Sequence, residues 1–351
     1  MNSKGVIKNI STNEIIEQIF YRKFGPKLGA LSEPVNHNIE SSIIKCLGKK
    51  GYGPKFLFQI PDNCSIIEFL IDTINLPFEK CFNKNIKEQL CNILNYFTLI
   101  SYSYRYNIDG DSLSLIPIED INSGEKINVT KTHYQKYVVD IYEKAKKSFK
   151  VFSEKFIQKY SKEKNPIEWA DFELVQNYMN NFMKLFKKNF NDKGFLVLNH
   201  NDAFRFNILL REKDQKIFLV DVEYFALNLP GYDIAYYLVE YFIKYEPEYN
   251  MALKDVDFDK IYAFYETFIN IFIQDHKFFE KKEGGKEFIE MIKSKKYFIK
   301  LINIINLSLF VWSIGNIKFE NKDKEQNNEF FFVHGLDRIK FYLKGIDAMS
   351  K

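Results

Sequence analysis

The sequence places three polar residues, Asp202, Asn207 and Asp221, at the ends of apolar segments. Asp202 follows an apolar strand-like segment, and Asn207 comes five residues later. Two short apolar runs, separated by the six polar residues 211–216, then lead to Asp221, a pattern that predicts a β-hairpin. Because the strands of a hairpin are antiparallel, a turn near residues 213–214 should place Asn207 opposite Asp221.

Two carboxylates and one carboxamide at one edge of a rigid hairpin form a set of hard oxygen ligands. Such ligands suit a divalent cation and a reacting hydroxyl group. Each of the three residues could also simply stabilise a turn, as Asp and Asn often do. The joint spacing favours the chemical interpretation, and turn capping is the alternative.

The composition is that of a globular protein with an excess of aromatic residues. Of the 351 residues, 46% are hydrophobic and 17% aromatic, enough for a substantial core in two domains or in one two-lobed domain. The net charge of +4 is small for a dedicated nucleic-acid-binding protein but suits anionic small ligands. Four scattered cysteines and the lack of an apolar leader favour reduced thiols and a cytoplasmic protein.

Residues 301–317 carry no formal charge and require a comparison with membrane spans. The segment barely reaches the ~20 residues that span a bilayer, and it contains several Asn and Ser side chains. A buried core helix is therefore predicted, without stable membrane insertion.

The hydrophobic patterns divide the chain into a small β-rich lobe, residues 1–72, and a large, mostly helical lobe, residues 73–351. The predicted fold class is thus α+β, with the hairpin in the larger lobe. Strands are expected within residues 5–25 and at residues 55–60 and 66–70. Helices are expected at residues 38–49, 86–106, 134–160, 167–190, 234–245, 258–279, 287–317 and 336–346.

The motifs around the hairpin resemble those of the choline/ethanolamine kinase family. The catalytic-loop motif of that family is similar to His200, Asn201, Asp202 and Asn207. Its second signature matches, in order and spacing, Asp221, Val222, Glu223, Tyr224, Asn228, Asp233, Ile234 and Glu240. Aminoglycoside phosphotransferases share the first motif in a looser form and lack the second.

The resemblance implies a protein-kinase-like fold and an ATP- and Mg²⁺-dependent kinase. The expected acceptor is the hydroxyl of choline or ethanolamine, in the first step of phosphatidylcholine or phosphatidylethanolamine head-group synthesis. Phosphoryl transfer requires alignment and charge neutralisation more than covalent chemistry, so three oxygen ligands on a stiff hairpin suffice. The family also makes a homodimer an expected oligomeric state.

By this resemblance, Asp202 is the catalytic base and accepts the proton of the substrate hydroxyl. Asn207 and Asp221 coordinate the Mg²⁺ that bridges the phosphates, and Asn207 thereby takes part in catalysis. Glu223, on the same side of the extended chain as Asp221, is expected to bind metal-bound water. Asp233 is expected to hold the catalytic-loop backbone rather than to touch the substrate.

Further segments resemble the family's nucleotide-binding parts. Arg22 is similar to an arginine that a strand presents to the nucleotide, and Glu40 stands where a helix glutamate pairs with it. Glu68 and Phe69 lie in the segment that holds adenine, and Asp221 completes the nucleotide-binding set. A surface ion pair is the alternative for Arg22 and Glu40.

The expected substrate is a small cationic amino alcohol next to Asp202. Glu240 supplies a counter-charge in this interpretation, while Tyr224, Tyr245 and Trp312 supply ring faces, each worth ~1 to 2 kcal/mol of cation–π attraction when desolvated. Trp312 could equally be a core residue. Tyr245 could be a chance match, because the chain has 22 tyrosines.

Four features depart from the family pattern. Residues 11–13 keep a Thr-Asn pair without the usual glycines, Leu309 replaces a tryptophan, Tyr236 replaces an asparagine, and Val222 replaces an aromatic residue. These departures leave choline and ethanolamine both open as substrates. They also leave two other functions open, a catalytically silent pseudokinase and a kinase for another amine such as an aminoglycoside.

Overall fold

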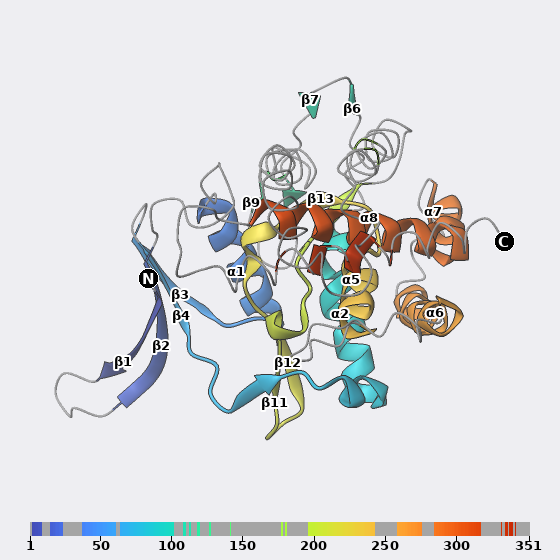
Figure 1. Ribbon diagram of the computed structural model, residues 1–351. Coiled ribbons are helices and arrows are strands. Elements are labelled where there is room, and N and C mark those ends of the chain that lie inside the picture. Colours follow the sequence, from blue (N-terminus) through green and yellow to red (C-terminus); the bar gives the residue numbers. More distant parts are fainter. Residues whose placement is uncertain are drawn as a thin grey trace, which may run out of the picture.

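The computed structural model describes the chain at residues 2–8, 15–23, 37–60, 64–101, 196–242, 258–275 and 284–316, with short pieces elsewhere. Figure 1 shows a small lobe of strands and one helix beside a larger, mostly helical lobe. The arrangement agrees with the predicted α+β fold class.

The small lobe contains a four-stranded antiparallel sheet with the strand order β1-β2-β4-β3. Its strands are β1 (Asn2–Lys8), β2 (Ile15–Lys23), β3 (Phe56–Ile60) and β4 (Cys64–Glu68). Helix α1 (His37–Lys50) packs beside β3, because the residues at its helical spacing, Ile43 and Leu47, are apolar and buried. The predicted helix at residues 38–49 and the strands at 55–60 and 66–70 are confirmed, with small shifts at their ends.

The chain leaves the small lobe after β4 and enters the larger lobe at β5 (Thr73–Asn75). β5 pairs with β11 (Ile208–Arg211), which pairs in turn with β12 (Lys216–Leu219). Figure 1 shows this small sheet below the larger lobe, next to the crossing between the lobes. The lobe boundary expected at residue 72 stays a prediction.

The predicted hairpin is present, but its register differs from the expectation by one residue. The strands pair Ile208 with Leu219, and the backbone N–H of Val220 donates to the carbonyl oxygen of Asn207 at 2.9 Å. Asn207 therefore faces Val220, and the prediction that it faces Asp221 was wrong. The cause is a four-residue turn at residues 212–215, which closes with Gln215 at a φ of 53°.

The larger lobe is built from helices α2 (Lys84–Ser101), α5 (Tyr232–Phe242), α6 (Phe258–Asp275), α7 (Gly285–Lys293) and α8 (Lys295–Gly315). Helix α5 is at its centre and contacts α2, α6 and α8. The helix expected at residues 287–317 is two helices, because Ser294 is extended and its side chain accepts a hydrogen bond from the N–H of Tyr297, which caps α8. The helices expected at residues 134–160 and 167–190 lie outside the described ranges.

Short elements complete the described chain. The strands are β6 (Ile108–Asp109), β7 (Ser112–Leu113), β8 (Ile118–Glu119), β9 (Lys126–Ile127), β10 (Val197–Asn199) and β13 (Ala226–Asn228). The 3₁₀ turns are η1 (Phe78–Phe82), η4 (Arg205–Asn207) and η5 (Val222–Tyr224). Where residues 336–346 are described, they are helical, as expected.

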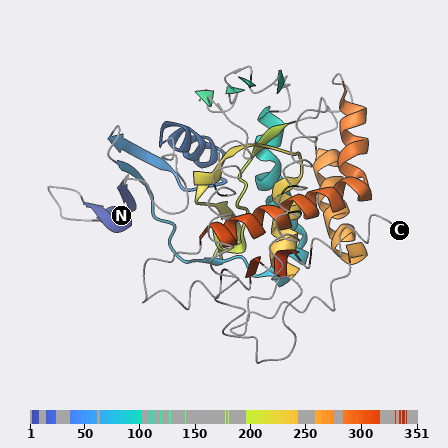
Figure 2. The ribbon, with the colours of Figure 1, turned by 45° about the horizontal axis from the view of Figure 1, so that its top comes forward.

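Helix α8 is, within the described ranges, the helix that is long and apolar enough to cross a membrane. Of its apolar window, 83% is buried inside the fold. Figure 2 shows α8 running across the larger lobe. The helix therefore forms part of the core, as predicted. All four cysteines are buried and free, in agreement with the expectation of reduced thiols.

Candidate active site

The carboxylate of Asp202 is held by hydrogen bonds to both of its oxygens. Asn207 Nδ2 donates to Asp202 Oδ2 at 2.8 Å and to the backbone oxygen of Asp202 at 2.9 Å. The hydroxyl of Tyr236, on α5, donates to Asp202 Oδ1 at 3.1 Å. The structure thus brings the expected base and the expected metal ligand Asn207 into direct contact.

The loop that carries Asp202 is fixed by the side chain of Asn201. Asn201 has a φ of 65°, in the left-handed region that is unfavourable for most residues other than glycine. Its side chain compensates this cost: Nδ2 donates to the carbonyl oxygen of Tyr224 at 3.0 Å, and Oδ1 accepts from Asn228 Nδ2 at 2.7 Å. Asn228 belongs to β13, which pairs with β10, so the loop is tied to the strand beside it.

Asp233, at the start of α5, holds the backbone of the same loop. Its two carboxylate oxygens accept the backbone N–H groups of His200, at 2.7 Å, and Asn201, at 2.9 Å. These bonds confirm the prediction that Asp233 fixes the loop. Burial raises the pKa of Asp233 to about 6, while the neighbouring His200 and the two N–H groups oppose this shift.

His200 has a structural role rather than that of a base. Its ring nitrogen Nε2 lies 2.9 Å from the carbonyl oxygen of Val220, and the backbone N–H of Asp202 donates to Nδ1 at 3.3 Å. Nδ1 is therefore the acceptor, and Nε2 carries the proton. Burial lowers the pKa of His200 and keeps the ring neutral. The ring therefore links the loop that carries Asp202 to Val220, just after the end of β12.

Burial raises the pKa of Asp202 to about 6. The hydrogen bond from Tyr236 lowers it, the negative charges of Asp221 and Glu240 raise it, and the hydrogen bond from Asn207 lowers it. A carboxylate with a pKa near the working pH can accept a proton from a hydroxyl as its oxygen attacks. The electrostatics of the loop therefore suit Asp202 to the role of a general base.

The donor set beside Asp202 fits a magnesium ion. Asp221 is exposed at the end of β12 and has a φ of 59°, and Asn207 and Asp221 line the same pocket. Glu223 follows on η5. No group of three or more His, Cys, Asp or Glu side chains in the described ranges could hold a metal by itself. Mg²⁺ typically takes one or two carboxylates and completes its shell with water and substrate phosphates, so an Asn and one or two carboxylates suffice.

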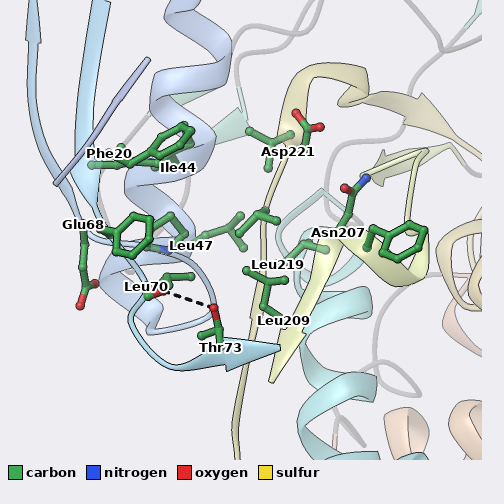
Figure 3. Close-up of a pocket in the computed structure, with 16 residues that line it drawn as sticks. Phe20, Ile44, Leu47, Glu68, Leu70, Thr73, Asn207, Leu209, Leu219 and Asp221 are labelled. Atoms are coloured by element: carbon green, nitrogen blue, oxygen red, sulfur yellow. Dashed lines mark hydrogen bonds between the residues drawn. The ribbon is translucent and has the colours of Figure 1, made fainter. Parts of the chain in front are cut away.

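The pocket has a volume of about 420 Å³, within the usual range for small-molecule sites. Figure 3 shows Asn207 and Asp221 on one side of it and Glu68 on the opposite side. Its walls come from the small-lobe sheet, α1, the segment between the lobes and the hairpin: Phe20, Ile44, Leu47, Pro54, Ile67, Glu68, Phe69, Leu70, Thr73, Phe206, Asn207, Leu209, Leu219, Val220, Asp221 and Val222. An apolar slot with oxygen ligands at one end suits a flat ring joined to phosphates.

The expected nucleotide-binding residues are distributed unevenly around this pocket. Glu68 and Phe69 line it, and Glu68 Oε2 also accepts the backbone N–H of Lys55 at 3.1 Å. Glu40 is buried on α1 and does not line the pocket. Arg22 lies in β2, and its side chain falls outside the described part of the structure, as do residues 11–13.

Two of the expected substrate residues lie close together. Tyr224 and Trp312 are both partly buried, and a hydrogen bond between their side chains opposes the burial that raises the pKa of Tyr224. The negative charges of Glu223 and Asp202 raise the pKa of Tyr224 further. Tyr245 lies outside the described ranges.

Glu240 is buried and paired with an arginine that the sequence did not identify. Arg338 Nη2 donates to Glu240 Oε1 at 2.6 Å, and both side chains are buried. Arg338 Nε also donates to His334 Nε2 at 3.3 Å, and Ser313 Oγ lies 2.6 Å from His334 Nδ1. The charge of Glu240 is therefore balanced within the fold. The sequence held no clear signal for this pair, because Arg338 lies between the apolar positions Leu336 and Ile339 and does not interrupt their helical spacing.

Together, the fold and the site define a protein-kinase-like phosphotransferase that acts on small molecules. The chain belongs to the choline/ethanolamine kinase family, whose model matches residues 7–343. No curated protein sequence matches the chain.

Solved structures of this type share the fold at low sequence identity. A choline kinase from Cryptosporidium parvum Iowa II superposes with a TM-score of 0.58 at 16% identity, covering 98% of this chain and 90% of that chain. An ethanolamine kinase from Plasmodium vivax gives 0.53 at 16% identity, covering 97% and 82%. The choline kinase LicA from Streptococcus pneumoniae, in complex with AMP, gives 0.50 at 17% identity, covering 99% and 93%. These similarities confirm the two-lobed, protein-kinase-like fold.

Proposed function

We propose that this protein transfers the γ-phosphate of ATP, with Mg²⁺, to the hydroxyl of choline or ethanolamine. The observation that carries the proposal is the Asp202 carboxylate, which Asn207 contacts directly and which neighbours the Asp221 end of a 420 Å³ pocket. A base, two metal ligands and a nucleotide-sized slot are the parts that phosphoryl transfer requires. The reaction would take place in the cytoplasm, as the first step of phospholipid head-group synthesis.

The geometry supports the following division of roles. Adenine would lie in the apolar slot against Glu68 and Phe69, and the phosphates would extend toward Asp221. Asn207 and Asp221 would hold Mg²⁺, which neutralises phosphate charge when bound. Asp202 orients the substrate hydroxyl and accepts its proton as the oxygen forms a bond to the γ-phosphorus and ADP leaves.

Choline is the first candidate for the acceptor. Tyr224 and Trp312 are partly buried aromatic side chains, the Tyr224 hydroxyl lies within electrostatic range of Asp202, and a quaternary ammonium has no N–H donors to satisfy. Glu240 already has an internal cation in Arg338, so the aromatic faces carry more of the recognition than a free carboxylate would. Leu309, where the family has a tryptophan, removes one aromatic ring and keeps ethanolamine as the second candidate.

The test is an ADP-release assay with ATP, Mg²⁺ and one acceptor at a time: choline, ethanolamine or kanamycin. We expect ADP release with an amino alcohol, and only a small residual rate of release in Asp202→Asn. Asp214→Asn is the matched control, because Asp214 lies in the hairpin turn, is exposed and bonds to Arg211. A folded, ATP-binding protein that releases no acceptor-dependent ADP would contradict the proposal, and release with kanamycin alone would favour the aminoglycoside alternative.

The catalytically silent alternative is tested by thermal unfolding. A protein that binds Mg²⁺-ATP at 100 times the dissociation constant gains ~2.7 kcal/mol of stability. An open pocket with Asn207 and Asp221 in its wall favours such binding. A chain that shows neither stabilisation by Mg²⁺-ATP nor turnover would be a pseudokinase.

A further inference from the structure

Tyr236 reaches from the centre of the larger lobe into the catalytic loop. Its hydroxyl donates to Asp202 Oδ1 at 3.1 Å, while Asn207 donates to Oδ2 at 2.8 Å. The side chain is only 6% exposed, and the ring of Tyr232, one helical turn earlier, lies 6.0 Å away between centroids. The phenol is therefore confined and cannot turn to solvent without disturbing α5.

We propose that Tyr236 is a positioning residue that fixes the orientation of the Asp202 carboxylate for attack by the substrate hydroxyl. This inference rests on the proposed function. A carboxylate turns easily about its Cβ–Cγ bond, since that torsion has broad minima. One donor on each oxygen, from two separate elements, fixes the carboxylate plane. Each oxygen can accept a second hydrogen bond, which leaves capacity for the substrate hydroxyl.

Helix α5 is well placed for this role because it already holds the loop backbone. Asp233 and Tyr236 are three residues apart on α5 and therefore lie on the same helix face. Asp233 accepts hydrogen bonds from the backbone N–H groups of His200 and Asn201. Tyr236 donates a hydrogen bond to the side chain of Asp202, which follows Asn201 in the loop. One rigid helix thus fixes both the backbone and the carboxylate of the base.

The residue type matters at this position. The family motif that the sequence resembles has an asparagine where this chain has Tyr236. An asparagine side chain is several ångströms shorter than a phenol, and its amide is not the equivalent of a hydroxyl at the end of a rigid ring. Contact between α5 and the carboxylate of Asp202 through a phenol is therefore a feature of this chain's own sequence.

The experiment compares Tyr236→Phe with Tyr232→Phe, using the full-length protein and the better amino alcohol. Both changes remove one hydroxyl from a buried ring on α5, but the hydroxyl that donates to Asp202 is that of Tyr236. We expect Tyr236→Phe to lower kcat about tenfold, because misalignment of a reacting group costs rate directly, with the KM values for ATP and acceptor within about twofold. Tyr232→Phe should leave kcat within about twofold of wild type.

A double variant separates positioning from a general structural effect. In an Asp202→Asn background, Tyr236→Phe should not lower the residual turnover further, because the hydroxyl acts through the carboxylate. Two results would overturn this inference and leave the proposed function intact. One is a Tyr236→Phe variant with the wild-type kcat. The other is a Tyr236→Phe change that lowers kcat by the same factor in the Asp202→Asn protein as in the wild type. A wild type that transfers phosphate to no acceptor would overturn the proposed function first.

Discussion

The two ends of the site are held together by different physical interactions. Around Asp202, the loop depends on buried and partly buried hydrogen bonds from or to Asn207, Asp233 and Tyr236. The pocket beyond Asp221 is instead enclosed mainly by apolar side chains: Ile44, Leu47, Ile67, Leu70, Leu209, Leu219, Val220 and Val222. The end of the site at Asp202 thus depends on the direction of its hydrogen bonds, and the nucleotide end depends on the shape of its apolar walls.

This difference determines which substitutions each end should tolerate. A buried hydrogen bond requires its partner, and removal of that partner leaves a polar group that is costly to bury. Apolar contacts depend on volume and tolerate swaps of similar size. We therefore expect isosteric changes to damage the base end, and only changes in size to damage the nucleotide end.

The largest expected effect is that of Asp221→Asn. The change keeps the shape of the side chain but removes one of the charges that would hold Mg²⁺ at the exposed end of β12. Turnover should fall on the order of a thousandfold, as is typical when one preorganised electrostatic contact in a catalytic site is lost.

The measurement is a Mg²⁺ titration of turnover, which should also require more Mg²⁺ than wild type. Because Asp221 is exposed, the unfolding midpoint should not fall. A variant that keeps its turnover and its Mg²⁺ dependence would remove Asp221 from the metal site.

The next largest effect concerns stability and the buried pair of Glu240 and Arg338. Glu240→Gln leaves the guanidinium buried without its counter-charge and should cost about 3–5 kcal/mol of unfolding free energy. The double variant Glu240→Gln with Arg338→Met removes both charges and should recover much of this loss. Urea denaturation of the three proteins measures the difference.

The same double variant tests what Glu240 does for the substrate. If the aromatic rings recognise the cation, the variant should keep the wild-type preference for choline over its uncharged isostere 3,3-dimethylbutan-1-ol. Loss of that preference would show that Glu240, on α5, is the counter-charge of the cationic substrate, as the motif implied.

Much of this arrangement could be predicted because it depends on local spacing. The alternation of apolar runs predicted the hairpin, and the 3.6-residue periodicity predicted α1, α2, α5 and α6. The resemblance of the motifs to those of the kinase family implied the contact of Asp233 with the loop, which the hydrogen bonds to His200 and Asn201 confirm. The exact pairing register of the hairpin strands could not be predicted. Gln215 adopts a left-handed conformation in the turn, and the sequence Asp-Gln-Lys gives no clear signal of this conformation.

The contacts that could not be predicted join distant parts of the chain. Arg338 and Glu240 are 98 residues apart, and Tyr236 and Asp202 are 34 apart. No local periodicity encodes such a pair, because each partner is placed by the packing of a different helix. Tyr236 could be recognised only as a departure from a family pattern, and its function emerged from the packing of α5 against the loop.

A smaller effect is expected for Asp233→Asn, which is close to isosteric. An amide has one oxygen, so one of the backbone N–H groups of His200 and Asn201 loses its acceptor. The loss should cost ~2 kcal/mol in stability and lower turnover about tenfold or more, since the loop carries the base.

The matched control is Asp259→Asn, because Asp259 is also acidic in the first turn of its helix but is exposed. Urea denaturation and turnover should both separate the two variants. Equal losses in the two proteins would mean that the general helix-terminal charge, and not the bonds to the loop, accounts for the effect.

The smallest effect is expected at the apolar end, for Leu70→Phe. Leu70 lines the pocket, and its carbonyl oxygen accepts a hydrogen bond from Thr73 Oγ1 at 3.2 Å, as Figure 3 shows. This bond involves the backbone, so the substitution should add volume to the pocket without altering the segment between the lobes. The dissociation constant for ATP should rise about tenfold, or ~1.4 kcal/mol.

Two controls decide whether volume is the cause. Ile71→Phe adds the same ring at a neighbouring, exposed position that does not line the pocket, and it should leave ATP affinity unchanged. Leu70→Met conserves volume and should be nearly silent, because interiors tolerate such swaps. Isothermal titration with ATP measures all three. If Leu70→Met weakened ATP as much as Leu70→Phe, the nucleotide end would depend on specific contacts as strongly as the base end does, and the contrast between shape and direction would not hold.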